Sequence, residues 1–139
     1  MTGLIVALVA VAVAAAFGLY RRITDGRARP VREDVPRLHP SHLGRELGTE
    51  ATLVQFSSPV CAPCRTTHTL LASLAAEDPG LVHIDLDATE HLGLTERFGI
   101  LRTPTVLVLD PGGAVRERIT GAPRRPEVLR VLAALQPSA

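Results

Sequence analysis

The sequence predicts an α/β fold, in which a mixed central sheet carries helices on both faces and is preceded by one N-terminal transmembrane helix. Three observations predict it. The N-terminus is a long apolar stretch, strand-like and helix-like segments alternate from about residue 35, and their order is β-α-β-α-β-α-β-β-α. Such alternation builds one sheet with helices packed over its faces.

Length and charge allow one globular domain after the apolar stretch. The chain has 139 residues and a net charge of +1. Acidic and basic residues are interspersed after about residue 40, which leaves no basic face for nucleic acid. We therefore expect no nucleic-acid partner and three parts: a transmembrane anchor over 1–20, an arginine-rich linker over 21–34 and a folded domain over 35–139.

The apolar stretch runs over 18 uncharged positions from Gly3 to Tyr20. It is just long enough to cross a bilayer core of about 30 Å. A helix that is apolar on all sides needs protein or lipid all around it, and a domain of this size has no spare core to supply. A cleaved signal peptide is the alternative, because residues 14–16 are all alanine, but no Lys or Arg precedes the apolar run. We expect an anchor that contacts membrane lipid through residues 3–20.

The segment after the anchor is rich in arginine. It contains one acid, Asp25, before Glu33, and its arginines are Arg21, Arg22, Arg27, Arg29 and Arg32. Positively charged flanks resist translocation, so this side of the membrane is predicted to be cytoplasmic. We expect a single-pass protein of the cell membrane with its folded domain in the cytoplasm. The same arginines also suit anionic lipid headgroups.

The first expected elements of the domain follow from local signals. A short strand is expected at Val35–Leu38, and Ser41 is the expected N-cap of a helix that runs to Leu47. Residues 51–57 are rich in β-favouring side chains and form the next strand. A helix follows over 61–77, with leucines along one side, and ends at the turn formed by residues 78–80.

The later elements also have local signals. A strand over 81–86 is followed by a helix over 90–98, which Gly99 ends. Residues 105–109 are continuously apolar, as in a buried strand. A Pro-Gly-Gly turn at 111–113 leads into a strand over 114–120, and Pro126 opens a last helix that ends at Leu135. The inner face of that helix is expected to carry Val128, Leu129, Leu132 and Leu135.

The only two cysteines, Cys61 and Cys64, lie two residues apart at the predicted strand-to-helix junction. This spacing excludes a scaffold with several disulfides and a four-thiolate metal site. Free backbone N–H groups at a helix start stabilise a thiolate, so Cys61 is the expected nucleophile. Cys64 lies nearly one turn further and is the expected resolving thiol. Pro63 suits the first helical turn, and Arg65 stands where haem attachment requires His.

A second motif lies some 40 residues later. Residues 97–105 read Arg-Phe-Gly-Ile-Leu-Arg-Thr-Pro-Thr, and a Pro-Gly-Gly hairpin and Gly121 follow. With the Cys-x-x-Cys turn and the Phe-containing strand before it, these motifs make residues 35–136 resemble the thioredoxin family. The resemblance implies a thioredoxin fold and a thiol:disulfide oxidoreductase. In a reducing cytosol such a protein acts as a disulfide reductase. It also implies no cofactor beyond a redox-active Cys61–Cys64 disulfide.

The resemblance implies partners and substrate-binding residues as well. The expected partners are disulfide-containing protein substrates and an electron donor, which is a thioredoxin-reductase-like protein or a membrane protein. Pro104 matches a proline that is cis in the family, and the backbone of Thr103 is expected to pair with an extended substrate chain. The alternative for Thr103-Pro104 is an ordinary proline at the start of a strand.

Three positions depart from the family pattern. Val60 replaces the usual Trp, and Ala62-Pro63 replaces Gly-Pro. Gln55 stands where thioredoxins carry a buried Asp that helps to deprotonate the resolving thiol, and an amide cannot act as a base. His83 aligns with the Lys near that Asp and is a candidate for proton transfer, since imidazole titrates near neutrality. Simple packing in the core is the alternative for His83.

A different class of function remains open on the same residues. His68 lies one helical turn after Cys64, and soft thiolates suit Cu(I). The chain would then be a copper- or zinc-binding thiol module that delivers metal to a membrane partner. Thr103-Pro104 favours disulfide chemistry, because it has no part in metal transfer. The direction of electron flow depends on the compartment and stays open.

Overall fold

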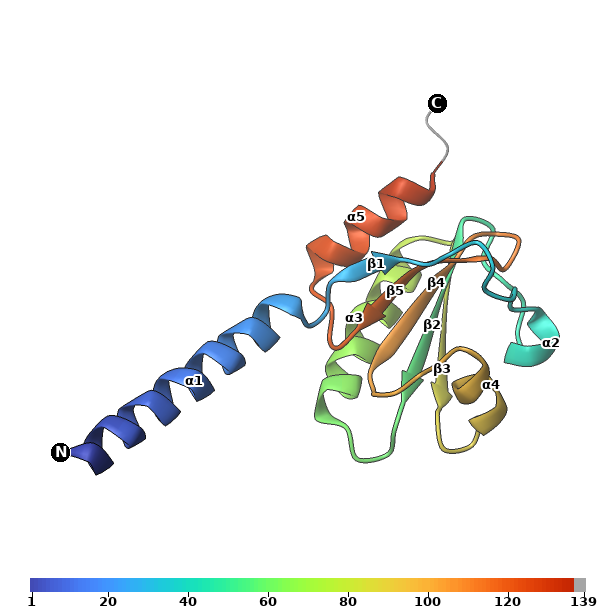
Figure 1. The fold of residues 1–139 in the computed structure, drawn as a ribbon. Coiled ribbons are helices and arrows are strands. Elements are labelled where there is room, and N and C mark those ends of the chain that lie inside the picture. Colours follow the sequence, from blue (N-terminus) through green and yellow to red (C-terminus); the bar gives the residue numbers. More distant parts are fainter. Residues whose placement is uncertain (137–139) are drawn as a thin grey trace.

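The strands and helices follow one another in the predicted order. The computed structural model describes residues 1–136 (Figure 1). Its elements are α1 (Thr2–Thr24), β1 (Ala28–Pro30), α2 (Pro40–Leu43), β2 (Ala51–Ser57), α3 (Ala62–Glu77), β3 (Leu81–Asp87), α4 (Leu92–Arg97), β4 (Thr105–Leu109), β5 (Val115–Thr120) and α5 (Arg125–Leu135). The last three residues of the expected domain, 137–139, lie outside the described part.

The five strands form one mixed sheet in the order β1-β5-β4-β2-β3. Strands β2 and β3 are parallel and are connected through α3, because parallel neighbours need a crossover connection. The other neighbouring pairs are antiparallel. The predicted α/β fold with a mixed central sheet is therefore confirmed.

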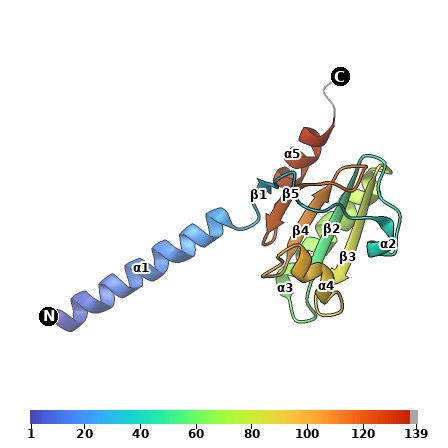
Figure 2. The same cartoon turned by 45° about the vertical axis from the view of Figure 1, so that its right-hand side comes forward.

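Each face of the sheet has its own apolar core, covered by its own pair of helices (Figures 1 and 2). Side chains alternate between the two faces along a strand. In β2, Leu53 packs with residues of α3 and α5, whereas Val54 and Phe56 pack on the side of α2 and α4. Consequently β2 and β4 are apolar on both faces, which is why both strands were visible in the sequence.

The strand expected at Val35–Leu38 is wrong. The first strand is β1, which lies inside the expected linker and pairs with the edge strand β5, with Ala28 opposite Ile119. Leu38 is fully buried, but it lies in a loop. Its backbone N–H donates to the carbonyl of Gly113. Strand β1 is short, and Arg29 and Pro30 are exposed, as is common at a sheet edge. Its pattern therefore resembled a polar linker.

The helix expected at 41–47 is shorter and begins earlier. It starts at Pro40 with His39 as its N-cap, so the assignment of Ser41 as cap is wrong. The backbone N–H of His39 donates to Nδ1 of His42 at 3.2 Å. Gly44 then adopts φ 66°, a left-handed conformation that ends the helix.

The inner face of α5 also differs from the expectation by one residue. Val128 and Val131 are fully buried, whereas Leu129 is 45% exposed. Leu132 and Leu135 are partly buried against the same core, as expected. Val128 and Val131 are three residues apart and therefore face the sheet together, whereas Leu129 lies to one side of that face.

Helix α1 extends away from the domain as a single rod (Figure 1). It has 23 residues, none of them buried, and spans about 34 Å at the usual helical rise. By length and composition it is the one helix among residues 1–136 that is suited to cross a membrane, and a signal sequence would pass the same test. It continues past Tyr20, so that Arg21 and Arg22 lie in its last turns.

The end of α1 is attached directly to the domain. The N–H of Gly26 donates to the carbonyl of Thr120 at 2.8 Å, and Asp25 forms an ion pair with Arg102 at 2.9 Å. Gly26 has φ +76°, and a side chain there would meet the carbonyl oxygen of Ala122. The expected linker is thus bound to β5 beginning at Gly26, two residues after α1.

Candidate active site

A disulfide between Cys61 and Cys64 lies at the N-terminus of α3. Cys61 is the N-cap of the helix, and its sulfur accepts the N–H of Cys64 at 3.2 Å. Cys61 is half-buried, whereas only 4% of Cys64 is exposed. The accessible sulfur is therefore also the one that the helix N-terminus can stabilise as a thiolate.

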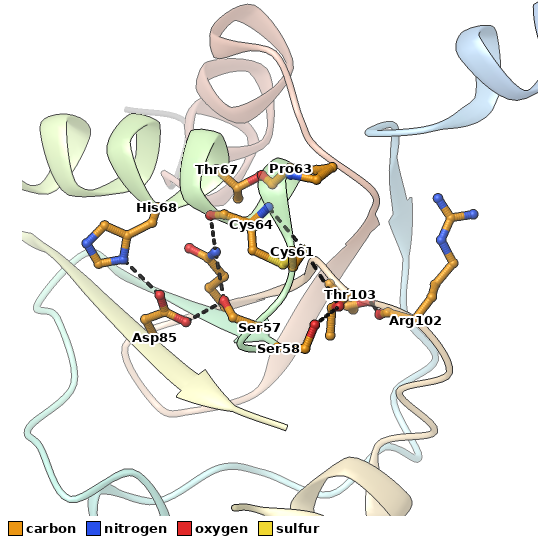
Figure 3. The surroundings of a disulfide bond; sticks show 12 residues. Ser57, Ser58, Cys61, Pro63, Cys64, Thr67, His68, Asp85, Arg102 and Thr103 are labelled. Atoms are coloured by element: carbon orange, nitrogen blue, oxygen red, sulfur yellow. Dashed lines mark hydrogen bonds and ion pairs between the residues drawn. A yellow bond between two sulfur atoms is a disulfide. The ribbon is translucent and has the colours of Figure 1, made fainter. Parts of the chain in front are cut away.

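The loop before β4 faces this disulfide from across the site (Figure 3). The Thr103–Pro104 peptide bond is cis, as the sequence motif predicts. Oγ1 of Thr103 lies 3.8 Å from Sγ of Cys61 and 3.0 Å from Oγ of Ser58. The carbonyl of Pro104 accepts the N–H of Gly121. The structure thus brings Thr103 close to the Cys61 sulfur, and it adds a contact with Ser58 that sequence reasoning missed.

Two apolar side chains stand out beside the disulfide. Val60 immediately precedes Cys61 and is 97% exposed, and Leu101 lies two residues before Thr103 and is 96% exposed. Arg65 and Arg102 flank the same region. The rim of the site is consequently apolar and basic, which suits a polypeptide partner.

Gln55 connects Cys64 to the sheet. Its side chain is fully buried. Its Nε2 donates to the carbonyl of Cys64 at 2.9 Å and to Oγ of Ser57 at 3.0 Å. Its Oε1 lies 3.0 Å from Nε2 of His83. Because an amide oxygen only accepts, the Nε2 of His83 carries the hydrogen.

His83 is held neutral. Burial lowers the pKa of His83 from 6.5 to about 4, with nearby His68 and Arg45 lowering it further and Asp85 opposing them. An imidazole with so low a pKa is a weak base at neutral pH. The geometry therefore makes Gln55 and His83 a buried structural link behind Cys64.

A hollow of about 350 Å³ opens beside the sulfurs, on the side away from Thr103. Both cysteines line it, together with Asp85 and His68. Asp85 accepts the hydroxyl of Ser57 at 2.6 Å and Nδ1 of His68 at 2.8 Å (Figure 3). Sequence reasoning missed Asp85 altogether. The available signal was alternation in β3, which puts His83 and Asp85 on the same face as Gln55.

The sequence matches a known protein family over most of its length. The family model for thioredoxin matches residues 39–134, well over half of the chain. The chain belongs to the thioredoxin family.

Individual thioredoxins and related proteins agree with this membership. Protein disulfide isomerase-like 2-1 of Oryza sativa subsp. japonica is 33% identical over 76 residues, or 52% of this chain and 21% of that protein. A thioredoxin of Chlamydia muridarum is 30% identical over 80 residues, or 58% of this chain and 78% of that protein. The chain thus spans about a fifth of the length of the rice protein.

A solved structure shows the same fold. A mutant thioredoxin from Halobacterium salinarum NRC-1 superposes with a TM-score of 0.58 at 19% identity, covering 66% of this chain and 79% of that chain. The predicted thioredoxin fold is therefore confirmed over the domain that follows α1.

The metal-binding alternative finds no support in the geometry of the described residues. Nδ1 of His68 is engaged by Asp85, so the imidazole is directed at a carboxylate. Within residues 1–136, no three His, Cys, Asp or Glu side chains are gathered in a way that would hold a metal ion. The alternative set of Cys61, Cys64 and His68 is therefore not among the described groupings that could hold a metal ion.

Proposed function

We propose that this thioredoxin-family chain is a thiol:disulfide oxidoreductase that works as a disulfide reductase tethered to a membrane. One observation carries the proposal. The disulfide at the start of α3 has its accessible sulfur, on Cys61, facing the cis Thr103–Pro104 loop at 3.8 Å. No other cofactor is required, because the two thiols themselves carry the two electrons.

The reduced pair acts in two steps. The Cys61 thiolate attacks one sulfur of a substrate disulfide and forms a mixed disulfide with it, while the other substrate sulfur leaves as a thiolate. Cys64 then loses its proton and attacks the Cys61 sulfur, which releases the second substrate thiolate and restores the Cys61–Cys64 disulfide. A substrate chain pairing with the backbone of Thr103 would hold its cystine over Cys61. Exposed Val60 and Leu101 would contact the rest of that chain.

Single-cysteine variants test this order. Cys61→Ser should abolish reduction of a protein disulfide by the full chain in detergent. Cys64→Ser should still attack once and accumulate a mixed disulfide that mass spectrometry detects. Turnover by Cys64→Ser at the wild-type rate would overturn the two-thiol mechanism.

The membrane tether determines which partners are within reach. Helix α1 is apolar and uncovered by the rest of the described chain, so its residues 3–20 are suited to contact lipid. Its last turn lies next to the active-site loop, because Asp25 pairs with Arg102, the residue before Thr103. A site held so close to the bilayer suits an electron donor in the membrane, although a thioredoxin-reductase-like donor would also reach it.

The arginines that follow the apolar segment support a cytoplasmic domain in the cell membrane. A reporter fused after Ala139 should be active if it works only in the cytoplasm and silent if it requires export. The opposite pattern, or a mature N-terminus near Phe17, would move the domain to the other side. The disulfide chemistry would be the same there, but electrons would have to come from or across the membrane.

A further inference from the structure

The proposed reaction needs a proton acceptor that the buried position at residue 55 does not provide. Cys64 attacks as a thiolate, so its thiol must first lose a proton. Gln55, which lies next to it, is an amide and accepts no proton at neutral pH. The N–H of His83 is committed to Gln55, and His83 does not line the hollow beside the sulfurs.

We propose that Asp85 and His68 together accept the proton of Cys64 across the hollow that all three residues line. The inference rests on the proposed reductase function and adds the group that activates its resolving thiol.

Position is the first argument for this pair. Asp85 lies opposite Gln55 in the parallel register of β2 and β3, and His68 lies one helical turn after Cys64 on α3. The carboxylate and the imidazole therefore approach the same hollow from the sheet and from the helix (Figure 3). Cys64 lines this hollow too, so water within it can carry the proton from the thiol to the pair.

The hydrogen-bond directions are the second argument. Gln55 donates to Ser57, which leaves the single Ser57 hydrogen to point at Oδ1 of Asp85. Oδ2 of Asp85 accepts from Nδ1 of His68. Both oxygens of Asp85 thus accept hydrogen bonds, and each has a further lone pair. Ser57 and Gln55 are positioning residues, and Gln55 also donates to the carbonyl of Cys64.

Access to solvent is the third argument. The side chains of Asp85 and His68 are 29% and 53% exposed, whereas Cys64 is almost fully buried. A proton that leaves Cys64 can therefore pass through the pair to bulk water. Imidazole is well suited to this transfer because it exchanges protons near neutral pH.

The charged and titratable groups around the pair come from α3, from β3 and from the loop after α2. Arg65 of α3 lines the same hollow and favours the thiolate that forms on Cys64. The ring of His83 in β3 lies 5.0 Å from that of His68. Arg45, after α2, donates to the carbonyl of His83 at 3.3 Å. Asp85 is the one carboxylate among the residues that line the hollow.

The step balances without a further reactant. The Cys64 proton moves to Asp85–His68, and the Cys64 sulfur forms a bond to the Cys61 sulfur. The bond between Cys61 and the substrate sulfur breaks, and the substrate leaves as a thiolate. The two cysteines are oxidised together, and the substrate disulfide gains both electrons.

An aromatic disulfide separates the two steps in one experiment. The reduced full chain in detergent is mixed with dithiobis(nitrobenzoate), whose thiolate product is coloured. The first colour release reports attack by Cys61, and the second reports resolution by Cys64. At pH 7, Asp85→Asn should leave the first phase unchanged and slow the second by about 100-fold, the usual contribution of a general base.

The pH dependence distinguishes a proton acceptor from a structural support. The second phase of Asp85→Asn should approach the wild-type rate as the pH rises toward about 10, where thiols ionise without a base. His68→Gln should show a smaller defect with the same pH dependence. Asp87→Asn is the matched control, because Asp87 lies two residues further on β3 and bonds Thr89 instead of lining the hollow. It should resolve at the wild-type rate.

Each contrary result has a distinct meaning. A second phase in Asp85→Asn that equals wild type, or that is slowed equally at every pH, overturns the proton-accepting role. Equal slowing by Asp87→Asn would show a general charge effect and would also overturn it. Loss of both phases in the wild-type chain would instead refute the reductase function on which the inference rests.

Discussion

Acid should destabilise this protein through one buried imidazole. His83 is 9% exposed, and burial lowers its pKa from 6.5 to about 4. The unfolded chain takes up a proton on this residue as the pH falls below about 6.5, while the folded chain keeps it neutral until about pH 4. Its contribution to stability is therefore complete above pH 6.5 and is lost as the pH falls from 6.5 to 4.

The size of the effect follows from the two pKa values. Each pH unit between them is worth about 1.4 kcal/mol, so the loss reaches roughly 2 kcal/mol at pH 5 and roughly 3 kcal/mol at pH 4. A domain of this size has a free energy of unfolding of about 5–15 kcal/mol. The predicted loss is thus a large share of the total.

Urea unfolding of the oxidised full chain, followed by far-UV circular dichroism at pH 8 and pH 5, measures this loss. His83→Gln is the reference, because its amide can still donate to Gln55 but does not titrate. Carboxylates with lowered pKa values, such as Asp110, also reduce the free energy of unfolding when acid protonates them. This contribution is the same in both proteins, so it cancels when their losses are subtracted. Wild type should lose about 2 kcal/mol more than His83→Gln between these pH values. Equal losses would refute the assignment of a neutral, buried His83.

Three further predictions concern other parts of the molecule. In the reduced protein, Cys61 should alkylate much faster than Cys64 at neutral pH, because it is accessible and caps α3; mass spectrometry of partly alkylated protein showing equal labelling would contradict this. Gln55→Met should lower the free energy of unfolding by about 2–5 kcal/mol, since it leaves the carbonyl of Cys64 and the N–H of His83 buried without partners; a wild-type urea midpoint would count against the network. Gly26→Ala should cost at least about 1 kcal/mol, because φ is +76° and the new methyl group meets the backbone of Ala122, while Gly18→Ala in open space should cost nothing by the same measurement.

Local sequence determined the elements that depend on neighbouring residues. Helix α1 was visible because apolar composition alone predicts it, and β2 and β4 were visible because both of their faces are buried. The placement of Cys61 at a helix start followed from the strand-to-helix junction. The cis bond before Pro104 followed from a family motif. Hydrophobic periodicity and helix capping depend on residues close together in the sequence, so they reveal the type and position of these elements without the tertiary structure.

Tertiary structure decided every feature that depends on which segments become neighbours. Strand β1 carries little pattern of its own, and it is a strand because β5 offers it an edge. The group beside Cys64 joins Gln55 and Ser57 to His83 and Asp85, 28 residues later, through side-chain contacts between β2 and β3. The identity of these partners depends on strand register, because a slip of one residue would turn each of these side chains to the opposite face. The pairing of β2 with β3 therefore placed Asp85 beside the cysteines, where the sequence alone had pointed to His83.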